Sequence, residues 1–327
     1  MGVHVIGVLG LDLGGDELDL SYRRAPLNER SGMPVLMAIG DPVAGPLIGL
    51  FYDAPSTPEQ LAGDTDLTPA HSHPCDNFRV VMKGELWVGQ ERYHHGEFRL
   101  QRSGRPYGAD GDAPHVEGNW RIISFADRRG HRVRPTNPEL RKQYSSPEVL
   151  ERMQQYYGDL LPVILPDEDD GVQGLVTTID KPFSKQLHID ATFGEADSWD
   201  AVGDARVAVS IMGVHDVGPV YIVQHTPAGA VATPSMTFES DVFRCVLEGS
   251  ALVGGETLEM GDTRTRPPGT TWDEVVAGPD GLDEVIIIGD RRGAAPTVLG
   301  DDVDGWADYV ASTVERLKTG LDALASA

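Results

Sequence analysis

The sequence predicts an all-β fold of the sandwich or barrel type, with helices only at its edges. Its 327 residues contain many short runs rich in Val, Ile, Phe and Leu, such as VAVSIMGV, PVYIVQH and EVIIIGD. Gly, Pro or Asp interrupts these runs roughly every eight to twelve residues, which is typical of closed or stacked antiparallel sheets. A chain of this length suits two domains or one large one.

An internal duplication supports two domains. GPLIGLFYDAP from Gly45 resembles GPVYIVQHTPAG from Gly218, and FRVVMKGEL from Phe78 resembles FRCVLEGSA from Phe243. The matches occur in the same order, at an offset of roughly 160 to 175 residues, which is the signature of a repeated unit. We therefore expect two barrels of similar construction.

The repeat sets the predicted domain boundaries. Residues 1–130 form an N-terminal barrel, 131–195 a connecting segment, 196–300 a C-terminal barrel and 301–327 an amphipathic helix. The connecting segment should hold a helix from Ser146, which is a suitable N-cap because Pro147 follows it at the first helical position.

The C-terminal helix carries an apolar stripe at helical spacing. One face holds Trp306, Val310, Val314, Leu317, Leu321 and Leu324. An apolar face of this kind packs against a neighbouring element. We expect it to cover a barrel or a partner subunit, and we expect the protein to be a homo-oligomer, most simply a dimer.

Composition and charge limit the partners and the cellular location that we expect for the protein. A formal net charge of −24 disfavours nucleic acid and anionic membranes as partners. Two cysteines, Cys75 and Cys245, are too few for a disulfide framework, which favours a reducing, cytoplasmic location. The apolar start MGVHVIGVLGLDLGG has no basic region and is too short to cross a bilayer, so it reads as a strand.

The stretch HSHPCDNFRVVMKGEL contains the candidate metal ligands of the first barrel. His71 and His73 form an HxH pair, Asn77 follows, and Gly84 ends the run. This pattern resembles the first motif of the cupin superfamily, G(X)5HXH(X)3–4E(X)6G. It departs from it in having Asn77 in place of Glu and in an upstream Gly63 that lies two residues too far away.

A second motif, G(X)5PXG(X)2H(X)3N, begins at Gly96 in GEFRLQRSGRPYG. Its spacing places Tyr107 where the family has histidine. After a short insertion, His115 is followed three residues on by Asn119, which reproduces the end of the motif. By this resemblance His115 is the preferred third metal ligand, and Tyr107 is the alternative.

The second copy retains the frame without the ligands. Met236 and Phe238 align with the HxH histidines, Val242 aligns with Asn77, and Trp272 ends the second motif. Thioether and aromatic groups do not hold a divalent cation of this kind. The resemblance therefore implies a bicupin: two double-stranded β-helix (jelly-roll) barrels with a few peripheral helices, of which only the first binds metal.

The residues of the first barrel suggest its chemistry. HxH on a strand places both imidazoles on one side of the sheet, and His115 would add a third nitrogen and leave positions open for substrate, water or dioxygen. Asn77 as a neutral fourth group raises the net positive charge of the site. That favours anionic substrates, and Fe(II), Ni(II) or Zn(II) over Mn(II).

Further residues are candidates for the pocket. Arg79 continues the strand and could hold a carboxylate in a two-pronged hydrogen bond; because Arg244 stands at the matching position, a structural ion pair in both barrels is the alternative. Tyr107, if it is not a ligand, is a candidate acid or hydrogen-bond donor. The remaining pocket-lining candidates are Gln101, Trp120 and Cys75.

The sequence thus predicts a metal-dependent bicupin enzyme that acts on a small, anionic or oxygenated organic molecule. Dioxygenase chemistry with Fe(II) is the leading prediction. Isomerase or lyase chemistry through an enolate, and a non-catalytic small-ligand-binding bicupin, are the alternatives.

Overall fold

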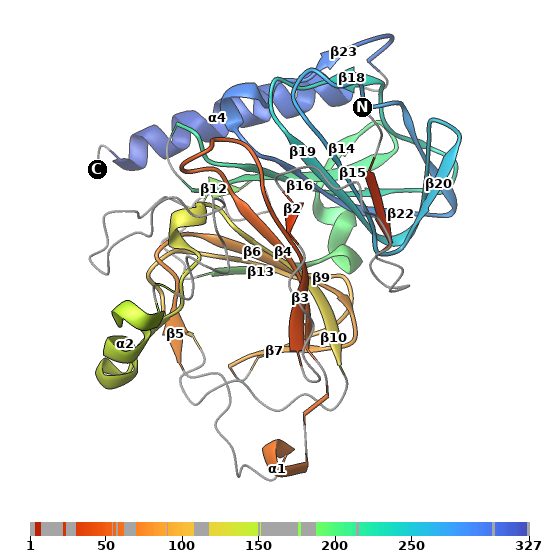
Figure 1. The fold of residues 1–327 in the computed structure, drawn as a ribbon. Helices are drawn as coiled ribbons and strands as arrows, with labels where there is room; N and C mark the ends of the chain where they lie inside the picture. The colour runs from red at the N-terminus through yellow and green to blue at the C-terminus, as the bar shows by residue number, and fades with distance from the viewer. Residues whose placement is uncertain are drawn as a thin grey trace.

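The computed structural model of the protein describes residues 4–7, 22–23, 31–53, 55–56, 58–61, 70–89, 91–107, 118–149, 151, 176–177, 188–213, 216–302 and 305–325. Antiparallel strands dominate these residues, and helices lie at the periphery, so the all-β prediction is confirmed. Figure 1 shows two bodies of strands, with the C-terminal helix α4 lying across the second.

The N-terminal barrel is built around a seven-stranded sheet in the order β13-β9-β6-β10-β4-β3-β2. Its strands are β2 (Tyr22–Arg23), β3 (Ser31–Ala38), β4 (Leu47–Asp53), β6 (Asn77–Lys83), β9 (Glu97–Gln101), β10 (Asn119–Phe125) and β13 (His188–Thr192). Two short pairs complete it: β5 (His71–Ser72) with β11 (Arg134–Pro135), and β7 (Leu86–Val88) with β8 (Glu91–Tyr93).

The C-terminal barrel repeats this order, because β21-β19-β22-β16-β15 corresponds to β9-β6-β10-β4-β3. Its strands are β1 (His4–Gly7), β12 (Val176–Thr177), β14 (Asp200–Val202), β15 (Ala205–Ile211), β16 (Val220–Thr226), β17 (Val231–Thr233), β18 (Met236–Thr237), β19 (Val242–Val253), β20 (Glu256–Glu259), β21 (Asp262–Arg266), β22 (Val275–Ile288) and β23 (Thr297–Val298). The duplication predicted from the sequence is therefore present in the fold.

Two strands pair across the predicted domain boundaries. β1, from the start of the chain, pairs with β21 of the C-terminal barrel, and β13, from the connecting segment, pairs with β9 of the N-terminal barrel. Pairing thus departs from the predicted limits 1–130 and 131–195 at these strands. The boundaries themselves stay a prediction.

The helices described are α1 (Pro58–Leu61), α2 (Pro138–Tyr144) and α4 (Trp306–Ala325), with 3-10 turns at Arg128–Gly130, Phe193–Ser198 and Arg291–Gly293. Asn137 caps α2, with Pro138 at its start. The helix predicted from Ser146 lies mostly outside the described residues; Ser146 Oγ accepts a hydrogen bond from the Val149 N–H at 3.4 Å.

The apolar stripe of α4 packs against the C-terminal barrel of its own chain. Trp306, Val310, Val314, Leu317 and Leu321 belong to one buried cluster with strands β15, β16 and β22. This confirms the packing expected from the stripe and directs it to a barrel rather than to a partner subunit. The side chain of Leu324 lies outside the described residues.

Side-chain alternation divides the residues of β6 between two cores. Phe78, Val80 and Met82 join a buried cluster that also contains Phe243 and other residues of the C-terminal barrel. The alternate residues of β6, beginning with Asn77, therefore face the interior of the N-terminal barrel. This places the candidate site inside the barrel, away from the junction.

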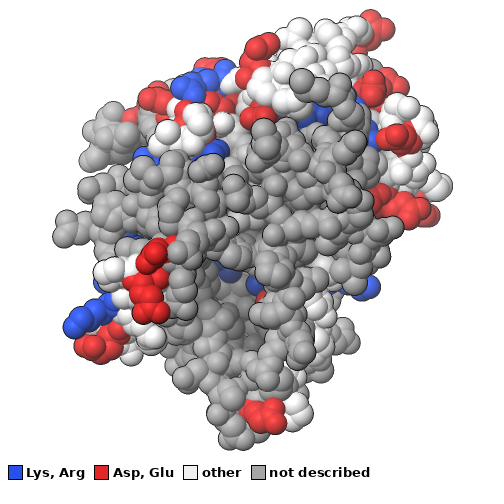
Figure 2. Space-filling view, viewed as in Figure 1, with Lys and Arg blue, Asp and Glu red and all other residues white. Residues whose placement is uncertain are grey.

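Acidic and basic side chains both lie on the described part of the face shown in Figure 2. Figure 2 shows red acidic side chains spread over the described parts of one face, with blue basic side chains between them. No described helix has the length and apolar character needed to span a bilayer.

Candidate functional site

A short backbone bridge brings the HxH segment to Tyr107. The His71 N–H donates to the Tyr107 carbonyl at 3.1 Å, and the Tyr107 N–H donates back at 3.0 Å. Met236 and Trp272 form the same reciprocal bridge in the C-terminal barrel, at 3.0 and 2.8 Å. The two motifs are therefore spatial equivalents, as their alignment in the sequence required.

The two histidines lie together and are buried. The ring centroids of His71 and His73 are 5.3 Å apart, and both residues are 6% exposed. His73 Nδ1 lies 2.8 Å from the His131 carbonyl oxygen, so this nitrogen carries the proton and donates it to the carbonyl. The other nitrogen, Nε2, then faces Tyr107 Oη at 3.1 Å with its lone pair.

The surroundings of His73 keep its ring neutral. Burial is the largest cause that lowers its pKa well below the ordinary value, and the neighbouring His71 and Arg79 lower it further. A neutral imidazole held through Nδ1 by a carbonyl is the arrangement that metal-binding histidines adopt. The geometry of His73 therefore fits a metal ligand that would bind through Nε2.

Arg79 extends this arrangement into a chain of hydrogen bonds. Its Nη2 donates to Tyr107 Oη at 3.1 Å and to Asn77 Oδ1 at 2.9 Å, and its guanidinium lies 4.8 Å from the Tyr107 ring centroid. Because Tyr107 Oη accepts from Arg79, its own proton points to His73 Nε2. The donors in this series of hydrogen bonds therefore all point the same way, from Arg79 through Tyr107 and His73 to the His131 carbonyl.

The matched arginines of the two barrels differ in their partners. Arg244 is bound by the buried carboxylate of Glu284 through Nε and Nη2, at 3.0 and 2.7 Å. The position equivalent to Glu284 in β10 is Arg121, which pairs with Asp53. No described carboxylate pairs with Arg79, so the ion pair considered for both barrels is present only in the second.

Two buried polar groups beside Arg79 lack a partner among the described residues. Asn77 and Gln101 lie opposite each other on β6 and β9. Asn77 Nδ2 and Gln101 Oε1 make no hydrogen bond, although Gln101 Nε2 donates to the Arg105 carbonyl at 3.3 Å. An unsatisfied buried polar atom costs about 1–3 kcal/mol, so these atoms mark where a ligand or water would be stabilised.

The structure places two predicted pocket residues among apolar neighbours. Cys75 is fully buried in a cluster with Phe125, whose ring lies 4.9 Å from that of His73. Burial raises the pKa of the Cys75 thiol well above its usual value, so it is not a thiolate. Trp120 stacks on Tyr52 at 4.9 Å and packs against the cluster between the barrels, not with the histidines.

The third predicted ligand, His115, lies outside the described residues. The described residues contain no group of three His, Cys, Asp or Glu side chains placed to hold a metal. The donor set they supply consists of two imidazoles with the Tyr107 hydroxyl beside them. That set fits a metal that takes its remaining protein ligand from His115 or Tyr107.

Sequence reasoning missed the backbone support of His73. The carbonyls of His131 and Arg132 lie 2.8 and 3.2 Å from Nδ1. A carbonyl can come from any residue type, so no sequence pattern identifies it. The segment ADRRG, which ends at Gly130, marks only the turn that precedes His131.

Comparison with known proteins gives similarity in fold only. No family model matches the chain, and no curated protein matches it. Salicylate 1,2-dioxygenase from Pseudoaminobacter salicylatoxidans is similar at 15% identity, with 88% of this chain and 82% of that chain covered and a TM-score of 0.44. Oxalate decarboxylase from Bacillus subtilis is similar at 11% identity, with 87% of this chain and 81% of that chain covered and a TM-score of 0.44. Vicilin from hazelnut, Corylus avellana, is similar at 12% identity, with 86% of this chain and 87% of that chain covered and a TM-score of 0.40.

Proposed function

We propose that this chain is a metal-dependent bicupin enzyme whose N-terminal barrel acts on a small organic anion. His71 and His73 hold the metal, with His115 as the preferred third ligand and Asn77 beside them. Metal-dependent chemistry of this kind suits a buried site with neutral nitrogen donors and open coordination positions.

The main support for the proposal is that no described carboxylate pairs with Arg79. Its equivalent, Arg244, is neutralised by Glu284, whereas among the described residues Arg79 meets only the neutral groups of Asn77 and Tyr107. Within the same part of the chain Arg79 Nε has no hydrogen-bond partner, and the residue is 6% exposed. A buried cation without a counter-charge is costly, and a substrate carboxylate or enolate would supply that charge within reach of the histidines.

Each residue has a distinct task in this proposal. Arg79 binds and orients the anion through its guanidinium. Tyr107 holds a proton at Oη and delivers it to, or takes it from, the bound substrate. A divalent metal bound by the histidines would supply Lewis-acid activation of substrate oxygens and, as Fe(II), activation of dioxygen for oxidation of the substrate, which provides the electrons.

Dioxygenase chemistry with Fe(II) is the form we favour, because a face of three nitrogen ligands leaves places for both substrate and oxygen. Isomerase or lyase chemistry through an enolate is the second candidate, and the Tyr107 hydroxyl favours it, since a positioned proton donor serves enolate chemistry directly. Small-ligand binding without turnover remains the non-enzymatic alternative, with Ni(II), Zn(II) or Mn(II) as other candidate metals.

Metal analysis of the purified protein tests the proposal. We expect about one equivalent of divalent metal, lost in His71→Ala and in His73→Ala. Met236→Ala and Phe238→Ala change the equivalent positions of the second barrel, and we expect them to retain the metal. A metal content that survives both histidine substitutions would overturn the proposal.

The reaction class is then tested with the metal-loaded protein. Oxygen consumption on addition of small hydroxylated aromatic or aliphatic carboxylates supports oxidation. Substrate conversion without oxygen supports isomerase or lyase chemistry. Saturable binding with no conversion in air or under nitrogen supports the binding alternative.

A further inference from the structure

Gly49 interrupts the inner face of strand β4, and neither a turn nor a bulge explains it. Leu47 and Phe51 belong to the apolar cluster of the N-terminal barrel, whereas Ile48 and Leu50 belong to the cluster at the junction. The buried Gly49 therefore shares the inner side with Leu47 and Phe51. Its pairing with β10 and β3 is regular, and the described glycines with positive φ do not include it. A glycine within a regular strand costs stability and often marks a close approach of a ligand or another backbone.

The second barrel has a full-sized side chain at the same position. Strand β16 is the equivalent of β4, and the alignment of GPVYIVQ with GPLIGLF places Ile222 where the first copy has Gly49. The register agrees, because Ile222 pairs with Ile286 on β22 and Gly49 pairs with Ile123 on β10. Ile222 is fully buried. The interior of the first barrel thus lacks one apolar side chain that its copy has.

Solvent reaches the interior of the first barrel near Gly49, but not the same level of the second barrel. Ile123, directly opposite Gly49, is 8% exposed, whereas its equivalent Ile286 is 1% exposed. Phe125, the next inner residue of β10, is 7% exposed, and its equivalent Ile288 is 0% exposed. The first barrel is therefore open to small molecules at this level, and the second is closed.

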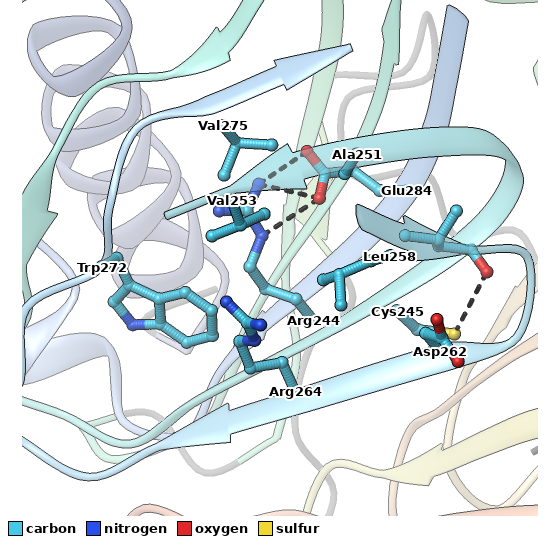
Figure 3. A pocket seen from close by; sticks show the side chains of 11 residues that line it. Arg244, Cys245, Ala251, Val253, Leu258, Asp262, Arg264, Trp272, Val275 and Glu284 are labelled. Atoms are coloured by element: carbon cyan, nitrogen blue, oxygen red, sulfur yellow. Dashed lines mark hydrogen bonds and ion pairs between the residues drawn. The ribbon is translucent and has the colours of Figure 1, made fainter. Parts of the chain in front are cut away.

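Gly49 lies in the same row across the sheet as Arg79. Ile123 pairs with Arg79 on one side and with Gly49 on the other. Because neighbouring strands are about 4.8 Å apart, the backbones of Arg79 and Gly49 are roughly 10 Å apart. Figure 3 shows that the equivalent arginine of the second barrel, Arg244, is already held by Glu284. Only the first barrel combines an arginine that no described carboxylate pairs with and a missing side chain in the same row.

The surroundings give this interior a charged side and an apolar side. Arg79 supplies the charge, and it meets the neutral groups of Asn77 and Tyr107. The inner neighbours of Gly49 are all apolar and come from three strands: Leu36, Leu47, Phe51 and Ile123. A ligand that fits both sides has a negative charge at one end and hydrocarbon at the other.

On the basis of the metal-dependent enzyme proposed for this barrel, we propose that Gly49 determines which substrates it accepts. The carboxylate of the substrate pairs with Arg79, and its hydrocarbon body lies over Ile123 and occupies the space at Gly49. The substrate class is then a monocarboxylate with an apolar body about the size of one ring. A short dicarboxylate or a polyhydroxylated acid would place polar groups among apolar side chains. Ile222 closes the second barrel to the same molecule.

Titration calorimetry of the full-length protein as purified, with benzoate and acetate, tests this role. Because benzoate buries a ring and acetate only a methyl group, we expect benzoate to bind at least about tenfold more tightly. Gly49→Ile should weaken benzoate binding at least about tenfold and change acetate binding less than about threefold. Unchanged benzoate affinity in Gly49→Ile, or no saturable benzoate binding up to about 10 mM, would overturn the proposal.

Gly49→Ala tests without any ligand whether the space is empty. Alanine restricts the unfolded chain more than glycine does, so it stabilises a regular strand position that has room for its side chain. We therefore expect a melting temperature equal to or above that of the wild type. A lower melting temperature would show that protein atoms fill the space and would overturn the proposal. This readout decides if Gly49→Ile does not fold.

Ile222→Val is the matched control in the second barrel and should leave benzoate affinity unchanged. Loss of binding in this variant would assign the ligand to the second barrel and refute the role of Gly49. Metal content separates this role from the proposed enzyme. If wild type and Gly49→Ile hold metal alike and bind benzoate alike, only the role of Gly49 fails. If the protein holds no metal but Gly49→Ile weakens benzoate binding, the role of Gly49 in binding stands and the metal-dependent enzyme fails.

Discussion

Asp76 and Asp241 hold equivalent positions in the two barrels, and each accepts a backbone hydrogen bond from a glycine of the other barrel. Asp76 Oδ2 accepts from the Gly213 N–H at 3.4 Å, and Asp241 Oδ2 accepts from the Gly40 N–H at 3.0 Å. Both glycines have positive φ, at 79° and 68°. The junction between the barrels is therefore a reciprocal clamp with approximate twofold symmetry.

The clamp should make stability depend on pH through Asp76. Burial raises the pKa of Asp76 to about 7, against the opposing effect of hydrogen bonds from Ser103 and Gly213. Since the pKa is higher in the folded chain than in the unfolded chain, this contribution is full below about pH 4 and is lost as the pH rises to about 7. Its upper limit is about 4 kcal/mol.

Asp76→Asn removes this titration. We expect the free energy of unfolding of the wild type, relative to that of Asp76→Asn, to decrease when the pH is raised from 4.5 to 7.5. These two values span most of the range in which Asp76 titrates. Urea unfolding at the two pH values measures it. Parallel stability curves for the two proteins would show that Asp76 does not titrate in this range.

Tyr107→Phe should distinguish the two candidates for the third metal ligand. The Tyr107 hydroxyl occupies His73 Nε2 in a 3.1 Å hydrogen bond, which must break before that nitrogen binds metal. If His115 completes the site, removing the hydroxyl frees Nε2 and tightens metal binding by about fivefold, since such a bond contributes about 1 kcal/mol. If Tyr107 is the ligand, affinity falls instead, and competition with a chelator of known affinity measures which.

The buried pair Arg244–Glu284 should be needed as a unit. Glu284→Gln leaves a buried guanidinium without its charge partner, and we expect a loss of about 3–5 kcal/mol in the free energy of unfolding. Replacing both residues, Arg244→Met with Glu284→Leu, should cost far less. Glu315→Gln is the control, because both members of its pair with Lys318 are exposed, and it should cost less than about 1 kcal/mol. A double variant as unstable as the single one would contradict this.

Helix α4 should contribute to the stability of the C-terminal barrel through Trp306. Its ring is buried, and Nε1 donates to Gln224 Oε1 at 2.7 Å, where Gln224 is fully buried. Trp306→Phe leaves that oxygen without a donor and creates a void, so we expect a loss of about 2–3 kcal/mol. Tyr309→Phe removes a hydroxyl that donates to the exposed Asp200 at 2.7 Å and lies 3.4 Å from the Val207 carbonyl, and it should cost less than about 1 kcal/mol. Equal effects of the two substitutions would contradict the packing described.

The features that were predicted correctly are those with a local or repeated pattern. The stripe from Trp306 to Leu321 follows helical spacing, and the duplication repeats whole strands, so both can be recognised without a structure. The two rings of HxH do lie together, 5.3 Å apart, but strand β5 ends at Ser72, so strand alternation alone does not place His73.

The features that were not predicted depend on breaks in that alternation or on contacts distant in sequence. A bend between β5 and β6 separates Cys75 from the alternation of the flanking strands, and a register shift between Trp120 and Arg121 changes the facing of β10. The difference between Arg79 and Arg244 depends on which residue, Arg121 or Glu284, stands on another strand far along the chain. The exchange of β1 and β13 is likewise a long-range pairing without a local signal.

That exchange makes each copy of the duplication depend on the other. A chain divided between the two barrels would give one fragment with β1 but without β21, and another with β13 but without β9. Each fragment would expose an unpaired strand edge, which promotes aggregation. The C-terminal copy can therefore drift in sequence but cannot be discarded, because the half of the chain that contains it also contains an edge strand of the N-terminal barrel.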